Sequence, residues 1–137
     1  MTRAIRHAIV LATAAVGASV VMAAQAPMVT RTVLLRHDTS AAGFEAVLVA
    51  VEIPAAQREG RHTHPGTGIV HVTEGAITLD HEGKPSATYK AGESFFVDAG
   101  KVHEGINRGN VSAKAIATFV VPKGSQLTTQ VASSPTK

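Results

Sequence analysis

Residues 60–75 read Gly60-Arg61-His62-Thr63-His64-Pro65-Gly66-Thr67-Gly68-Ile69-Val70-His71-Val72-Thr73-Glu74-Gly75. Two histidines separated by one residue precede a Pro-Gly turn and a run rich in β-branched residues. Side chains at positions i and i+2 of a strand point to the same face, so His62 and His64 are expected to direct their imidazoles into one space. Because neutral imidazole is the commonest metal ligand near neutral pH, this pair predicts half of a metal site.

A second stretch, about forty residues later, supplies the other half. It reads Gly92-Glu93-Ser94-Phe95-Phe96-Val97-Asp98-Ala99-Gly100-Lys101-Val102-His103-Glu104-Gly105-Ile106-Asn107. The pattern predicts a strand, a turn at residues 98–100 and a histidine at the start of the next strand. Three neutral imidazoles, from His62, His64 and His103, suit Zn, Cu, Fe or Ni and leave positions open for water or substrate.

Together the two stretches resemble the paired motifs of the cupin superfamily, over roughly residues 45–122. The first motif is Gly, His-x-His, Glu, Gly; the second is Gly, Pro-x-Gly, His, Asn with fixed spacing. The positions that match are His62, His64 and Gly75 in the first motif and Gly92, Gly100, His103 and Asn107 in the second. The resemblance implies a β-barrel that holds a divalent metal (Zn, Cu, Ni, Fe or Mn) through the three histidines.

The sequence departs from the family pattern at two positions. The metal-binding Glu of the family corresponds to Gly68, and the Pro of the second motif corresponds to Asp98. Without the carboxylate, the site is either a neutral three-histidine face or one that recruits another group. His71 is a candidate direct ligand, pocket wall, hydrogen-bonding partner or proton carrier, or else a side chain that fills the barrel. Strand alternation places it on the face opposite Gly68 unless a bulge intervenes.

Many short β-rich segments separated by turn signals predict an all-β fold, a sandwich or barrel, with no long helix in the mature chain. The double-stranded β-helix, or jelly-roll barrel, of cupins fits this pattern, with the barrel domain at 27–124 and a flexible C-terminal tail at 125–137. The expected strands are 28–36, 44–53, the histidine segment, 69–72, 76–80, 86–90, 94–97 and 111–121. Segment 28–36 is expected to pair either with its own sheet or with a neighbouring subunit.

Residues 1–26 are typical of a secretory signal peptide of the Sec type, with cleavage after Ala23 or Ala26. Arg3 and Arg6 precede an apolar run at 8–21, which is shorter than the roughly 20 residues that span a membrane. An uncleaved anchor is the alternative. We therefore expect a periplasmic or secreted protein. Removal of this segment lowers Lys+Arg from 13 to 11 against 10 Asp+Glu, a formal charge of +1, and leaves no basic stripe for nucleic acid or an anionic membrane.

Two hypotheses about function follow. The first is an exported metallo-cupin, to which the resemblance gives oxygenase- or isomerase-type chemistry on a small organic molecule. The second is a non-catalytic module that binds or senses a small ligand with a degenerate metal site. The resemblance also implies a homodimer. The chain has no Cys, and no motif for a nucleophilic serine or for a nucleotide is present.

Overall fold

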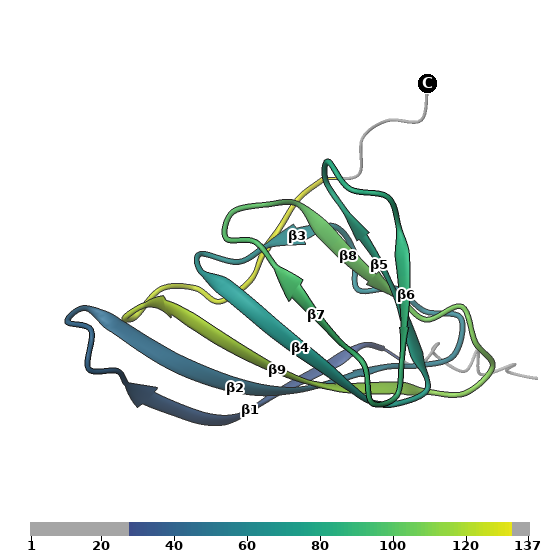
Figure 1. Cartoon of the computed structure of the whole chain (residues 1–137), viewed down its shortest axis with the longest axis horizontal. Coiled ribbons are helices and arrows are strands. Elements are labelled where there is room, and N and C mark those ends of the chain that lie inside the picture. The colour runs from purple at the N-terminus through teal and green to yellow at the C-terminus, as the bar shows by residue number, and fades with distance from the viewer. Residues whose placement is uncertain (1–27, 133–137) are drawn as a thin grey trace, which may run out of the picture.

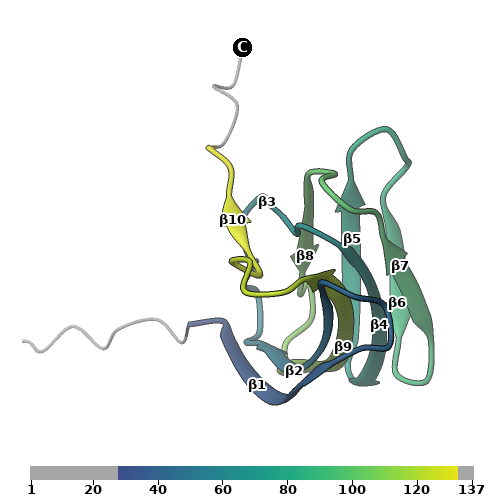
Figure 2. The same ribbon diagram turned by 90° about the vertical axis from the view of Figure 1, so that its left-hand side faces the viewer.

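The computed structural model describes residues 28–132, and the predicted signal peptide lies outside this range. These residues form ten strands and no helix, so the prediction of an all-β fold is confirmed. The strands form two antiparallel five-stranded sheets that face each other as the walls of an open barrel (Figures 1 and 2). Between Met28 and Ala132, no helix is long and apolar enough to cross a membrane.

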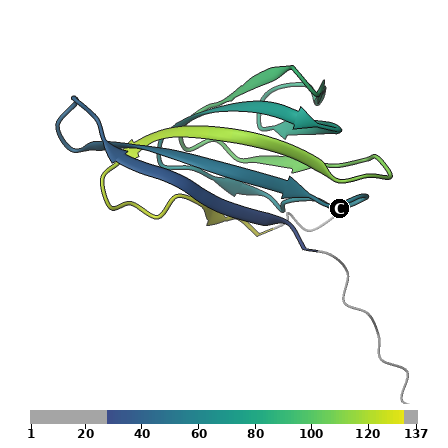
Figure 3. The same ribbon diagram turned by 90° about the horizontal axis from the view of Figure 1, so that it is seen from below.

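The larger sheet contains the longest strands. In spatial order it consists of β1 (Thr30–Asp38), β2 (Phe44–Ile53), β9 (Ala113–Pro122), β4 (Thr67–Glu74) and β7 (Ser94–Val97). Seen from below, β1 is the edge strand of this layer (Figure 3). It pairs with β2 of the same chain, which answers the question that the sequence leaves open.

The smaller sheet carries the histidine segments. In spatial order it consists of β10 (Thr129–Gln130), β3 (His62–Thr63), β8 (His103–Ile106), β5 (Ala76–His81) and β6 (Ala87–Lys90). The chain moves from this sheet to the larger one between β3 and β4, at the Pro65-Gly66 turn. It returns at Gly75, whose φ of 69° is the left-handed conformation that glycine adopts without strain.

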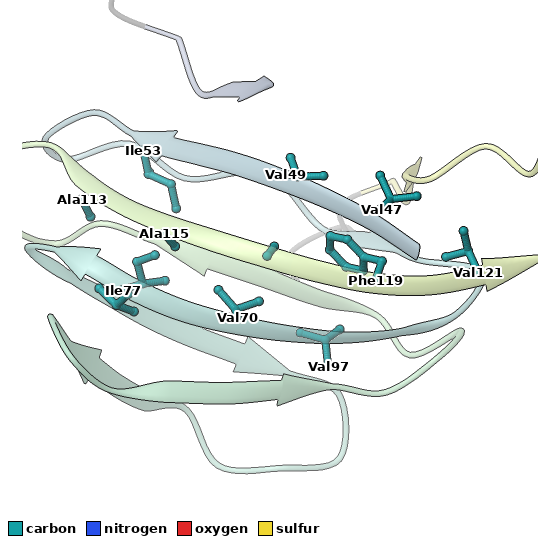
Figure 4. Packing of buried hydrophobic residues seen from close by; sticks show 12 residues of the cluster. Val47, Val49, Ile53, Val70, Ile77, Val97, Ala113, Ala115, Phe119 and Val121 are labelled. Carbon is teal, nitrogen blue, oxygen red and sulfur yellow. The ribbon is translucent and has the colours of Figure 1, made fainter. Parts of the chain in front are cut away.

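The core lies on the inner face of the larger sheet, because side chains alternate along its strands (Figure 4). Inward positions of β2 and β4 carry branched residues such as Val47, Ile53 and Val72, which are fully buried. The central strand β9 instead presents alanines on this face, at Ala115 and Ala117. These small side chains leave room above the middle of the sheet, where the cavity lies.

The C-terminal segment differs from the flexible tail predicted from residue 125 onward. Thr129 and Gln130 form β10, which pairs with β3, and Leu127 packs against the core. A short polar strand gives no hydrophobic alternation to detect, and its place in the sheet comes from pairing with a distant segment. Residues up to 132 therefore belong to the domain, while 133–137 lie outside the described range.

Asn107 connects the end of β2 to the loop before β9. Its side chain is 2% exposed, and its Nδ2 donates to the carbonyl oxygens of Ile53 (2.9 Å), Pro54 (3.2 Å) and Val111 (2.7 Å). Its Oδ1 accepts from the amide of Gly109 at 2.9 Å. These bonds fix the segment that follows β8.

Candidate metal centre

The three predicted ligands converge. His62 and His103 are direct cross-strand partners in the β3–β8 pair, and their ring centroids are 4.3 Å apart. His64 follows β3 on the same face, with its ring centroid 4.9 Å from His62 and 5.0 Å from His103. One nitrogen from each ring lies within 4.8 Å of the others, and all three side chains are buried. The arrangement is one that could hold a metal ion.

Backbone carbonyls orient all three rings. Nδ1 of His62 bonds to the oxygen of Gly60 at 2.7 Å, and Nδ1 of His103 bonds to the oxygen of Lys101 at 3.0 Å. Nδ1 of His64 bonds at 2.7 Å to the carbonyl oxygen of Leu127, which belongs to the C-terminal segment. A neutral ring that donates from Nδ1 carries its lone pair on Nε2. Each histidine therefore presents the lone pair of Nε2 as a metal ligand, which fits a divalent transition metal.

Burial keeps these rings neutral. Desolvation lowers the pKa of His64 and of His103 from 6.5 to about 4, and it lowers the pKa of His62 in the same direction. The backbone hydrogen bonds oppose this effect, but burial is the larger cause in each case. At neutral pH no proton has to leave an imidazole before a cation binds.

The metal-free protein is expected to lose stability as the pH falls from 6.5 to about 4. In this window His64 and His103 take up protons in the unfolded chain but not in the folded chain. The free energy of unfolding therefore becomes smaller as the pH falls. The loss is on the order of a few kcal/mol and levels off below the window. Urea unfolding at a series of pH values measures it. A His64→Gln/His103→Gln variant should give a flatter profile, and an equal slope in both proteins would contradict the assignment.

His71 does not belong to this centre. It lies on the exposed face of β4, and its Nδ1 is 2.9 Å from Oγ of Ser94, its cross-strand neighbour on β7. The irregularity in β4 falls between Val72 and Glu74, beyond the ligand region, so alternation holds from Gly68 to His71. His71 therefore points away from the cavity and is neither a metal ligand nor part of the cavity wall.

His81 lies beside this centre, although no motif in the sequence points to it. It is 3% exposed and lies opposite His103 in the β5–β8 pair, with the two rings 6.1 Å apart at 24°. Its Nε2 is 3.2 Å from Oδ2 of Asp98, the residue that stands in place of the motif's Pro. His81 thus lies directly beside His103, a predicted ligand. The register of the β5–β8 pair brings the two histidines together, and a single histidine beside a turn does not reveal that register.

The three histidines line a cavity of about 260 Å³. Its walls are mostly apolar, with Val49, Val51, Ile53, Val70, Ile77, Leu79, Phe95, Val97, Ala115, Ala117, Phe119 and Leu127. The other polar side chains that line it are Arg31, Glu59 and Thr128. Sequence reasoning missed Arg31 and Glu59, because one lies on the N-terminal strand and the other in a loop, and no motif links them.

A family model decides the classification. The model described as Cupin domain, Cupin_2, matches residues 49–121, which is more than half of the chain. The chain belongs to the cupin family. This match spans β2 to β9, including both histidine segments, and it confirms the resemblance inferred from the two motifs.

Solved structures with the same fold are only distantly related to this cupin. A cupin-like protein from Thermotoga maritima MSB8 is 19% identical, with a TM-score of 0.61 and 77% of each chain covered. The DMSP lyase DddQ from Ruegeria pomeroyi DSS-3 is 19% identical (TM-score 0.56), with 62% of this chain and 42% of the lyase covered. An oxalate oxidase is 23% identical (TM-score 0.52), with 57% and 46% covered. The chain thus spans less than half of either enzyme. No curated protein sequence gave a significant match.

Position 68, where the cupin motif has its Glu, is closed to a side chain. A Cβ built on Gly68 would lie 2.6 Å from Cε1 and 2.9 Å from Cδ1 of Phe119, whose ring packs 4.3 Å from that of His64. Phe119 is 4% exposed and held by the core of the larger sheet. The phenyl ring therefore takes up the space next to residue 68, so that this cupin keeps three histidines without the carboxylate.

Proposed function

We propose that the protein binds a divalent transition metal through His62, His64 and His103 and acts on a small organic molecule held in the adjoining cavity. The observation that carries this proposal is the convergence of three neutral imidazoles, oriented by carbonyls, at the wall of an apolar cavity. The reaction is of the oxygenase or isomerase type. The metal would supply a Lewis acid or a centre for oxygen activation.

The chain's own residues would bind and orient the reactants. The three histidines contribute no charge, so they leave the full charge of the cation facing the cavity. Apolar walls such as Val49, Leu79 and Phe95 exclude water and strengthen electrostatic interactions inside. The small volume restricts the substrate to a compact molecule, and the names of the structural neighbours, an oxalate oxidase and a DMSP lyase, support a small organic substrate.

Elemental analysis of the protein purified from its native compartment tests the proposal. We expect one transition-metal ion per chain, and we expect Zn, Cu or Ni to compete with Fe or Mn, since nitrogen donors favour the later metals. A preparation that contains only Mn or Fe would contradict the metal preference. A chain that stays metal-free when it is incubated with each of these ions would overturn the proposed function.

Phe119 gives a reason to keep a second candidate function. Because its ring fills the space beside Gly68, the centre lacks the charge that a fourth, carboxylate ligand would supply. The second candidate is therefore a non-catalytic module that binds or senses a small molecule. A variant with His62, His64 and His103 all changed to alanine separates the two. Retained ligand binding without metal favours the module, whereas joint loss of metal and turnover favours the enzyme.

We also propose that two copies associate through the outer face of the larger sheet. An apolar row crosses this face in register, formed by Leu35, Leu48, Ile69 and Phe96, with the polar Thr118 between Leu48 and Ile69. Leu35, Ile69 and Phe96 are 56%, 56% and 49% exposed. Such a row is typical of a surface that is covered in solution. A second copy of the chain is the expected occupant.

Ile69→Asp is expected to convert a dimer to a monomer, because it places a charge in the middle of the apolar row. Sedimentation-velocity centrifugation measures the change. Val111→Asp is the matched control, since Val111 is similarly exposed, at 62%, but lies in the loop before β9. A wild-type chain that sediments as a monomer at high concentration would exclude this interface.

Export is part of the proposal and rests on the sequence of residues 1–26. Intact-mass analysis of the protein from the periplasm or medium is expected to show cleavage after Ala23 or Ala26. The formal charge near +1 after cleavage supports a small-molecule role rather than binding to nucleic acid or to an anionic membrane.

A further inference from the structure

An ion pair faces the cavity beside the three histidines. Arg31 and Val33, two residues apart on β1, both line the cavity, so the inner face of this edge strand completes its wall. Nη2 of Arg31 lies 2.9 Å from Oε1 of Glu59, and the two side chains are 29% and 13% exposed. Among the described residues that line the cavity, Arg31 is the only lysine or arginine.

Glu59 holds the guanidinium in place. Its second oxygen, Oε2, accepts the amide hydrogen of Gly105 at 3.2 Å. A Cβ at Gly105 would lie 2.5 Å from Oε2, so a larger residue there would displace this carboxylate from its present position. Gly105 is two residues after His103 on β8 and therefore faces the same side. Strand β8 thus positions both His103, a predicted ligand, and Gly105, which holds the carboxylate that binds Arg31.

The ion pair and the three histidines line the same cavity. Glu59 is also held by the amide of Gly105, two residues after His103. A molecule in the cavity therefore meets the centre and Arg31 together.

The charge balance of the loaded cavity favours an anion. A divalent cation and Arg31 give three positive charges, Glu59 gives one negative charge, and the histidines are neutral, so about two positive charges remain uncompensated. The carboxylate of the cupin motif would have removed one of them, but Gly68 supplies none. Excess charge in an apolar cavity is costly unless a counter-charge binds there.

We propose that Arg31 binds the carboxylate of a small organic acid with an apolar body, and that the acid's reacting part faces the histidines. This inference rests on the proposed function and names its substrate class. Arginine has five N–H donors in a planar fork that matches a carboxylate, and the pair with Glu59 joins only Nη2. A cavity of about 260 Å³ is near the lower end of ligand sites, which suits a compact acid.

Benzoate and its neutral isostere benzamide test the proposal on the zinc-loaded full chain by isothermal titration calorimetry. Benzoate is expected to bind the wild type more tightly than benzamide. Arg31→Gln should weaken benzoate binding by about 10- to 100-fold, the effect of losing charged hydrogen bonds, and should leave benzamide binding unchanged. Equal binding of the two probes to the wild type, or no saturable benzoate binding, would overturn the proposal.

Two further variants separate anion binding from a structural role of the pair. Glu59→Gln removes the competing carboxylate, so benzoate binding is expected to strengthen by a few-fold, whereas a structural role predicts the same loss as in Arg31→Gln. Arg36→Gln is the matched control. Arg36 is on the same strand as Arg31 and also pairs with a glutamate, Glu45, but it lies outside the cavity lining. An effect of Arg31→Gln no larger than that of Arg36→Gln would overturn the proposal.

The folding and metal content of each variant are measured in parallel. Thermal melts check folding, and if Arg31→Gln does not fold, Arg31→Lys, which keeps the charge but loses the fork, should give a smaller loss of benzoate affinity. Zinc content should be the same in all variants. If the wild type takes up no zinc, the proposed function fails, and the dependence of benzoate binding on Arg31 is then decided on the metal-free chain.

Discussion

Zinc affinity is expected to fall by about a thousandfold when His103 is replaced by alanine, since one of three donors to a tightly held ion is lost. His103 lies directly opposite His62 in the sheet, and its Nδ1 is already engaged by a carbonyl, so Nε2 is its contribution to the centre. Competition titration with a chromophoric chelator measures the affinity. His62→Ala and His64→Ala are expected to have effects of similar size.

His71→Ala is the matched control for this experiment. It removes an imidazole from β4, the strand that follows His62 and His64. This imidazole lies on the exposed face of the strand, where it contacts Ser94. Zinc affinity should stay at the wild-type value. A His103→Ala variant that binds zinc as well as His71→Ala does would show that the three buried rings are not the metal site.

Gly68→Glu is expected to destabilise the fold, although it restores the residue of the cupin motif. Its Cβ would meet the ring of Phe119 at 2.6 Å in a well-packed core, and overpacking of this kind costs about 1–3 kcal/mol. The carboxylate would also be buried without a cation in the metal-free protein, which adds to the cost. Urea unfolding of the metal-free chain measures the loss.

Phe119→Leu tests whether the ring is the obstacle. The change removes Cε1, the atom that a Cβ at position 68 approaches most closely. The double variant Gly68→Glu/Phe119→Leu should lose less stability than the sum of the two single variants, and it should bind zinc more tightly than the wild type because the carboxylate adds a fourth ligand. Additive losses, or unchanged zinc affinity in a folded double variant, would contradict the account of position 68.

The features that follow a periodic pattern could be predicted from the sequence. Alternation and turn residues predicted most strands, and the i, i+2 spacing of His62 and His64 placed both rings on one face. His103 could be added because its motif fixes its distance from a turn. The same alternation placed His71 on the far side of its strand from position 68, as the structure has it.

The features that depend on strand register could not be predicted. His81 is brought against His103 by the β5–β8 pairing, and Arg31 meets Glu59 across a separation of 28 residues. The ring that faces position 68 belongs to Phe119, about fifty residues along the chain. No local signal encodes such contacts, because they arise when segments distant in sequence are placed side by side by sheet topology.

X-ray absorption spectroscopy at the zinc edge, combined with anomalous diffraction from crystals of the zinc-loaded protein, is the decisive experiment for the three-histidine site. We expect one buried ion with three imidazole nitrogens at about 2.0–2.1 Å, belonging to His62, His64 and His103. An ion bound only by exposed histidines such as His37 or His71, with the three buried rings left without metal, would contradict this expectation.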